Sequence, residues 1–249
     1  MRKLSVWMTG VCVGSVIASA QASEPATNPA TSSDEVAASS VQISATRDPE
    51  LKSYRQLLKG LNAYESHLAK APGSVFRFQL IPQKSDVSLH DVGLRIVSDD
   101  SSIPIPVAND GGFTLPRDKK AEADNADLLT NQKKGSFRWR PEVRSAGLTA
   151  NTRRLGDLRL ECEIRWAVEY DELPFLRRNM FRAAGGPCHS SMITVIYFSP
   201  FKSSTVTLVS GERKMVLTLL ADGLRYSPPL HEQSWNDDAV IVFEPVARQ

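Results

Sequence analysis

In residues 158–168, LRLECEIRWAV, apolar side chains occupy every second position and charged side chains fill most of the gaps. A period of two is typical of a β-strand that has one buried face and one charged face. The stretch therefore predicts a strand whose Cys162 points into the core, and it makes β structure the expected basis of the fold.

A short helix and further strands are predicted after this stretch. Asp171 suits the N-cap of the helix, Pro174 suits its first turn, and Gly185-Gly186-Pro187 ends it. Strands are predicted at residues 192–198, at the hairpin formed by 204–210 and 214–220, and at 239–243.

An amphipathic helix is predicted before the first strands. Asp48 suits its N-cap, Pro49 suits its first turn, and Pro72-Gly73 ends it. Between Leu51 and Leu68, apolar residues recur at spacings of three and four, which gives one apolar stripe. We expect this stripe to pack on a sheet; the alternative is a helix that binds a partner or a membrane surface.

The segments between this helix and residue 135 show β signals and then a polar stretch. Strands are predicted at residues 75–81 and 87–97, and Asp110-Gly111-Gly112 predicts a turn before residues 113–115. Residues 117–135 are polar and predict a long loop or a domain boundary.

The predicted fold class is therefore mainly β with two helices, an α+β protein with a β-sandwich-type body and an N-terminal amphipathic helix. The chain after residue 46 divides into two segments, and whether they form one or two folded domains is left open. Residues 47–125 would hold the first helix and a β segment, and residues 126–249 would form a β-rich domain with a disulfide and an inserted helix.

The N-terminus has the three parts of a secretory signal peptide. Arg2 and Lys3 are followed by an apolar run at residues 4–17 and by the small-residue cleavage site Ala20-Gln21-Ala22. Residues 1–22 are thus predicted to be removed, and the Ala-, Ser- and Thr-rich residues 23–46 are predicted to be a disordered linker. The expected location is periplasmic or secreted, with no transmembrane segment in the mature chain.

Removal of the signal peptide changes the cysteine and charge balance. Cys12 would be lost, which leaves Cys162 and Cys188 as one possible pairing in an oxidising compartment. A reactive or metal-binding pair is the alternative. The chain has 30 basic and 28 acidic residues, and without Arg2 and Lys3 it becomes neutral. Net charge then favours neither a membrane nor nucleic acid, and we expect no nucleic-acid partner.

A resemblance to a known family covers residues 94–116. It consists of Leu94-Arg95-Ile96-Val97, Ser98-Asp99-Asp100, Ile103-Pro104-Ile105-Pro106 and Gly111-Gly112-Phe113-Thr114-Leu115-Pro116. This segment resembles the carboxypeptidase regulatory-like family, a transthyretin-like β-sandwich. With residues 156–163 and 234–238, the whole chain also resembles exported bacterial proteins to which no activity is assigned. The resemblance implies a non-catalytic accessory or binding module.

No catalytic motif is found in the sequence. A nucleophile elbow, a phosphate-binding glycine loop, a dinucleotide glycine motif and a calcium-binding loop are all missing. His231-Glu232 begins like a zinc-protease motif, but Trp235 stands where the second histidine is required. We therefore predict no catalytic residue, cofactor or metal. An envelope hydrolase whose site is assembled from distant residues is kept as the alternative function.

Arginine is concentrated in one part of the chain. Residues 133–165 hold nine basic residues against four acidic ones, and Phe137 and Trp139 alternate there with Arg138 and Arg140. Guanidinium groups suit anionic ligands, and aromatic rings suit stacking. Arg138, Arg140 and Arg144 are the predicted ligand-binding residues, for a protein or an anionic envelope polymer. The alternative is a solvated strand face, and the oligomeric state is left open.

Overall fold

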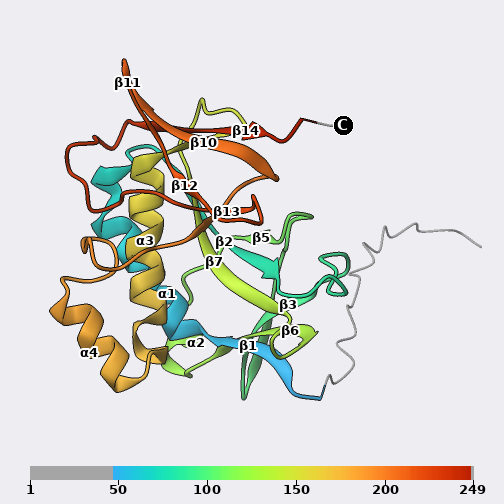
Figure 1. Cartoon of the computed structure of the whole chain (residues 1–249). Coiled ribbons are helices and arrows are strands. Elements are labelled where there is room, and N and C mark those ends of the chain that lie inside the picture. The colour runs from blue at the N-terminus through green and yellow to red at the C-terminus, as the bar shows by residue number, and fades with distance from the viewer. Residues whose placement is uncertain (1–46, 248–249) are drawn as a thin grey trace, which may run out of the picture. The chain divides into compact units, whose positions relative to one another are not determined.

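The computed structural model describes residues 47–247, and these residues hold four antiparallel sheets and four α-helices within one compact unit (Figure 1). The mainly β, α+β class is confirmed, with four helices in place of the predicted two. The signal peptide predicted at 1–22 and the linker predicted at 23–46 lie outside the described residues and stay predictions. Within residues 47–247, no helix has the length and apolar character needed to cross a bilayer.

The first sheet contains four short strands in the order β1-β6-β3-β4. They are β1 (Pro49–Ser53), β6 (Asp127–Lys133), β3 (Leu94–Ser98) and β4 (Ser101–Ile105). β3 and β4 form a hairpin around Asp99 and Asp100. Alternate residues of β3, Leu94 and Ile96, are buried in the core, as the strand period requires.

The second sheet places strand β7 opposite strand β2. Its strands are β5 (Gly112–Phe113), β2 (Val75–Pro82) and β7 (Phe137–Arg144), in that order. β2 and β7 pair along their full lengths without a register shift. Gly111, at a φ of 83°, makes the turn before β5, and an added Cβ there would lie 2.4 Å from the Leu80 carbonyl oxygen.

Two further sheets come from the C-terminal part of the chain. The third has the order β11-β10-β14-β8, with β11 (Arg213–Val216), β10 (Ser203–Ser210), β14 (Val240–Pro245) and β8 (Thr152–Arg154). The fourth has the order β12-β13-β9, with β12 (Thr218–Leu219), β13 (Arg225–Ser227) and β9 (Tyr197–Phe198). The predicted hairpin around Gly211 and the predicted last strand are both confirmed.

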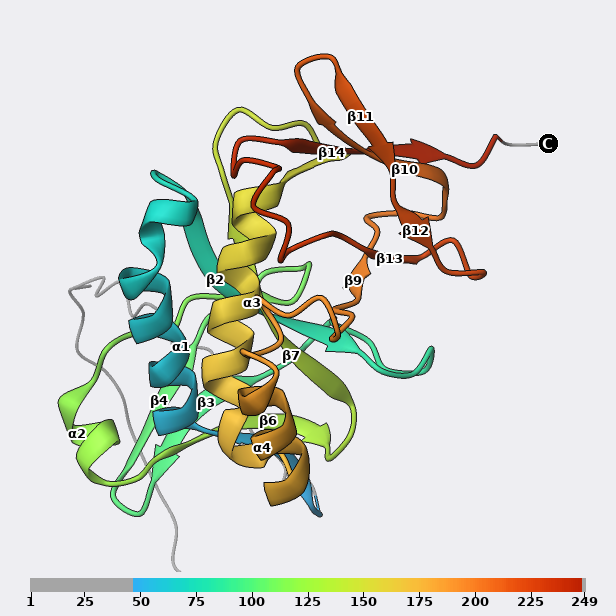
Figure 2. The same ribbon diagram turned by 60° about the vertical axis from the view of Figure 1, so that its left-hand side comes forward.

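The helices gather around α3. They are α1 (Tyr54–Ser66), α2 (Lys119–Ala123), α3 (Leu155–Glu169) and α4 (Phe175–Ala183), with one-turn 3₁₀ helices at Leu68–Lys70 and Tyr170–Glu172. α1 runs alongside α3 in both views (Figures 1 and 2). A Cβ added at Gly60 of α1 would lie 2.7 Å from Val168 Cγ2 of α3, so the two helices cross at a glycine.

Helix α3 overturns the strand predicted at 158–168. Residues two apart on a helix point to nearly opposite sides, because each residue turns the chain by about 100°. Leu160 and Ile164 enter one core, which lies among α1 and the first two sheets, whereas Leu158 and Cys162 enter a second core under the third and fourth sheets. A helix between two cores therefore reproduces the alternation of a strand.

Several other sequence predictions are corrected. The second helix begins at Phe175 and not after Asp171, and the strand predicted at 87–97 begins only at Leu94. The first helix begins at Tyr54 and not at Asp48, because residues 49–53 pair with β6 as strand β1, which leaves Leu51 49% exposed. Residues 117–135 hold α2 and β6 in place of a loop. In the segment 192–198 only Tyr197 and Phe198 pair as a strand.

The sheets also join residues 47–125 to residues 126–249. β6 pairs with β1 and β3, and β7 pairs with β2. These pairings cross residue 125, and α3 contributes to both cores. The two cores therefore share one helix at their junction, and the cavities described next lie beside that helix.

Candidate ligand-binding site

Strand β7 presents its arginines on the side opposite its buried aromatic residues. Phe137 and Trp139 are buried, Trp139 with 8% of its surface exposed, and the indole Nε1 of Trp139 donates to Glu50 Oε1 at 3.1 Å. Arg138 and Arg140 therefore share the other face of the strand, as the period of two predicts.

This face of β7 forms one wall of a cavity of about 410 Å³ and of another of about 530 Å³. We call the larger one the α3–α4 cavity, because Arg165 and Trp166 of α3 and Arg177 and Phe181 of α4 line it. The smaller one, the β2–β7 cavity, is lined by both of those strands and by residues 196–200. The two cavities share four lining residues and are therefore adjacent: Arg140, Arg165, Ile196 and Phe198.

The α3–α4 cavity is strongly cationic. Its charged lining among the described residues consists of five arginines and one carboxylate: Arg138, Arg140, Arg165, Arg177, Arg225 and Glu169. The aromatic side chains of Trp166, Phe181 and Phe198 also line it. Such a combination favours ligands that carry anionic groups together with flat apolar faces.

Glu169 partly neutralises two of these arginines. Its Oε1 accepts a hydrogen bond from Arg140 Nη1 at 2.7 Å, and its Oε2 accepts one from Arg165 Nε at 3.0 Å. Burial lowers the pKa of Arg140, and the nearby positive charge of Arg165 lowers it further, whereas Glu169 raises it. The lowered pKa of Arg140 therefore reflects its burial first and the neighbouring positive charge second, and the guanidinium stays protonated.

Two arginines of this cavity have no carboxylate partner. Among residues 47–247, neither Arg138 nor Arg177 has a carboxylate oxygen within 4.0 Å. The Arg138 guanidinium lies 5.8 Å from the centre of the Phe198 ring, and both arginines are exposed. Their charges are thus available to a ligand without the loss of an existing ion pair.

The β2–β7 cavity is more nearly neutral. Its arginines are Arg140, Arg144, Arg153 and Arg165, and its carboxylates are Asp110, Glu142 and Glu161. Each carboxylate already pairs with an arginine: Arg77 contacts both Asp110 and Glu142, and Arg153 contacts Glu161 at 2.6 Å. This cavity is therefore the weaker candidate for an anionic ligand.

The Arg153–Glu161 pair is buried and connects the cavity wall to strand β7. Glu161 Oε1 accepts from the backbone N of Val143 at 2.7 Å as well as from Arg153. Burial raises the pKa of Glu161, while the Arg153 charge lowers it in part. Arg153 Nε is buried without a hydrogen-bond partner among the described residues. The pair explains how Glu161 remains buried in a helix that lies between two cores.

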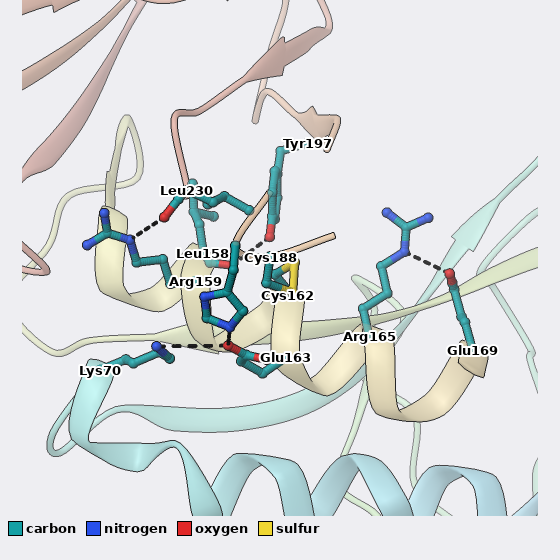
Figure 3. The surroundings of a disulfide bond; sticks show 11 residues. Lys70, Leu158, Arg159, Cys162, Glu163, Arg165, Glu169, Cys188, Tyr197 and Leu230 are labelled. Atoms are coloured by element: carbon teal, nitrogen blue, oxygen red, sulfur yellow. Dashed lines mark hydrogen bonds and ion pairs between the residues drawn. A yellow bond between two sulfur atoms is a disulfide. The ribbon is translucent and has the colours of Figure 1, made fainter. Parts of the chain in front are cut away.

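The predicted disulfide is present and supports the α3–α4 cavity (Figure 3). Cys162 of α3 bonds to Cys188, just beyond α4, with Cα atoms 5.6 Å apart. Cys162 itself lines the cavity. Beside it, Glu163 forms an ion pair with Lys70 at 3.8 Å, and its Oε1 lies 2.8 Å from His189 Nε2. The bond closes the loop that contains α4, so it fixes the wall on which Arg177 lies.

The predicted ligand-binding residues are divided between the two cavities. Arg138 and Arg140 line the α3–α4 cavity, whereas Arg144 lines the β2–β7 cavity and pairs with Glu142 at 3.2 Å. Three arginines of the larger cavity were not predicted: Arg165, Arg177 and Arg225. Arg165 lies within the basic stretch but was assigned to a strand face, and no local signal marks the other two, because they reach the cavity from α4 and β13.

A metal centre finds no support in the described residues. Within residues 47–247, no group of three or more His, Cys, Asp or Glu side chains is arranged to hold a metal ion.

The chain was also compared with known proteins. No protein-family model matches it, and neither a curated protein nor a solved structure shows significant similarity to it. The arguments below therefore depend on the site itself.

Proposed function

We propose that this protein is an exported binding or accessory module whose α3–α4 cavity holds an acidic saccharide of the cell envelope. The observation that carries the proposal is the charged lining of the cavity, in which one carboxylate faces five arginines. A cavity of about 530 Å³ falls within the range of small-molecule sites, and it would accept one or two sugar units of a polymer.

The ligand class follows from the chemistry of the lining. Arginine binds carboxylate and phosphate groups in a bidentate manner, whereas an uncharged sugar has no anionic group that could pair with several guanidinium groups. Trp166 and Phe198 add flat apolar surfaces, on which sugar rings stack. Arg138 and Arg177, which have no carboxylate partner, are the residues that we expect to meet the anionic groups first.

The test uses a double variant, Arg138→Gln with Arg177→Gln. Oligogalacturonate, a carboxylated sugar oligomer, serves as the probe, and isothermal titration calorimetry measures its affinity. We expect the double variant to bind at least about tenfold more weakly, because two charge-assisted contacts are lost. Both side chains are exposed, so the thermal midpoint should stay that of the parent.

A control variant separates local from global charge. Lys134→Gln with Lys214→Gln removes the same charge from exposed residues that do not line the cavity. The control should bind as the parent does, and binding by the parent should weaken as salt rises toward physiological strength. Equal binding by the parent and the R138Q/R177Q variant, or no binding of the probe by the parent, would refute the proposal.

Export and the family resemblance are further parts of this proposal. The disulfide supports an oxidising compartment. Mass spectrometry of the protein recovered from the periplasm should find an N-terminus near Ser23, and an intact N-terminus at Met1 would contradict export by cleavage. The resemblance of residues 94–116 to the carboxypeptidase regulatory-like family, and the β-sandwich that it implies, stay predictions.

A further inference from the structure

Helix α4 leaves an apolar face uncovered. Phe175, Leu176 and Met180 are 73%, 80% and 58% exposed, and no residue of α4 is buried. At about 100° per residue these three side chains fall within one sector of the helix, together with Asn179. Concentrated exposure of large apolar side chains on one helix face is typical of an interaction site.

Basic side chains border this face, and α4 contains no acidic residue. In the same projection, Arg177 lies on one side of the apolar sector and Arg182 on the other, and both are exposed. The acidic residues just before α4 are already paired: Asp171 contacts Lys59 and Glu172 contacts Lys52. The exposed surface of α4 is therefore apolar at its centre and positively charged at its edges.

The opposite face holds α4 in this orientation. The Phe181 ring lies 6.0 Å from the Trp166 ring of α3, and the Arg178 guanidinium lies 5.3 Å from the centre of the Tyr170 ring. The disulfide at Cys188 attaches the end of this segment to α3. Figure 2 shows α4 beside the C-terminal end of α3, to which these contacts attach it. The apolar face is therefore held outward in the folded protein.

We infer that α4 lies on the surface of an anionic bilayer. Phe175, Leu176 and Met180 would insert between the lipid headgroups, and Arg182 would contact lipid phosphates. Arg177, which also lines the α3–α4 cavity, would add positive charge at the other edge. A helix with an apolar face bordered by arginines has the chemistry of interfacial membrane helices. A second copy of the chain fits the face poorly, because two α4 helices packed together would bring their arginines close to one another.

This inference goes beyond the proposed function, and its test avoids the sugar site. The variant Leu176→Ser with Met180→Ser removes apolar surface from side chains that do not line the α3–α4 cavity. The variant Arg182→Gln removes a positive charge, also outside the cavity. The matched control, Val75→Ser with Val216→Ser, changes two exposed apolar residues on strands β2 and β11.

Vesicle co-sedimentation is the measurement, with vesicles of phosphatidylglycerol and phosphatidylcholine and with vesicles of phosphatidylcholine alone. All variants are recovered from cells with the same N-terminus, so differences among them report on the substituted residues. We expect binding to the anionic vesicles, at least about tenfold weaker binding for L176S/M180S, and a several-fold loss for R182Q. The V75S/V216S control should bind as the parent does.

The inference would be wrong if the parent protein failed to sediment with anionic vesicles, or if it bound neutral vesicles equally well. It would also be wrong if L176S/M180S bound anionic vesicles as strongly as the parent does. Analytical ultracentrifugation gives a further contradicting result: a parent dimer that L176S/M180S converts to a monomer would assign the face to a second copy. Circular dichroism and the thermal midpoint establish that L176S/M180S is folded before it is compared.

Discussion

Arg140 Nη1 of strand β7 lies 2.7 Å from Glu169 Oε1, at the last residue of helix α3, and this ion pair joins the two walls of the α3–α4 cavity. The same carboxylate also binds Arg165. Glu169 therefore occupies a position that an anionic ligand would compete for.

Replacing Glu169 by Gln should strengthen the binding of oligogalacturonate. The substitution removes the carboxylate that competes for Arg140 and Arg165 while the amide keeps its shape and one hydrogen-bond acceptor. The free energy of unfolding should fall by no more than about 1 kcal/mol, because Glu169 is partly exposed. Titration calorimetry and urea denaturation measure the two effects. Weaker binding by E169Q would mean that Glu169 positions the arginines for the ligand.

Loss of the disulfide should destabilise the protein substantially. The sequence separation of 26 residues between Cys162 and Cys188 predicts a loss of about 3 kcal/mol in the chain-entropy treatment. Urea denaturation of Cys162→Ser with Cys188→Ser measures it, and the parent under reducing conditions serves as the control. Peptide mapping of the unreduced parent should find the linked pair, and a free thiol at either cysteine would contradict the structure.

The buried ion pair makes a different prediction for Glu161. Glu161→Gln would leave the guanidinium of Arg153 buried without its counter-charge, and we expect a loss of about 3 to 5 kcal/mol. Glu142→Gln, which removes a carboxylate that pairs with the less buried Arg77 and Arg144, should cost less. Urea denaturation compares the two variants. An equal loss of unfolding free energy in the two variants would mean that burial does not make the Arg153–Glu161 pair more stabilising than the pairs of Glu142.

Asp110 should make a small contribution to stability that depends on pH. Its hydrogen bond with Arg77 lowers the pKa of the carboxyl below its ordinary value, against the opposing effect of burial. The contribution is therefore present above about pH 4, the ordinary value, and is lost as the pH falls through the lower pKa of the folded state. Because the side chain is half exposed, we expect less than about 1 kcal/mol.

Asp110→Asn is the variant for this measurement. The difference in unfolding free energy between parent and D110N should shrink in acid and be full at neutral pH. A difference that stays constant across this range would show that the carboxylate charge plays no part. D222N, which removes another exposed carboxylate whose pKa is lowered, provides a comparison away from the cavities.

Strands with one buried face were predicted from the sequence, whereas helix α3, which is covered on two sides, was not. β2, the β10–β11 hairpin and β14 were all predicted, and buried residues occupy alternate positions in β2, β10 and β14. α3 was missed because two cores cover it from opposite sides, which produces the alternation of a strand. The period of the apolar residues indicates which positions are buried. It does not distinguish a segment buried against one core from a segment buried between two.

For a related reason, only some residues of the candidate site could be predicted from the sequence. Arg138 and Arg140 are two residues apart on one strand, so their shared face follows from the strand period. Arg177 and Arg225 reach the same cavity from α4 and from β13. Their proximity is set by long-range packing and by the disulfide. The exposure of Leu176 and Met180 on α4 could not be predicted either, because nothing in the local pattern distinguishes a covered apolar stripe from an uncovered one.

Strand β14 lies between β10 and β8 in the third sheet, although it is among the last residues described. The buried residues of the first core run from Tyr54 to Val168, so all of them precede β14 in the chain. A chain of which only the part up to about Pro200 has been exported would therefore hold every buried residue of the first core, while Leu155 and Leu158 on α3 still lack the strands that cover them. On the proposed route of export, such a chain exposes an apolar surface to chaperones until the final strand has crossed.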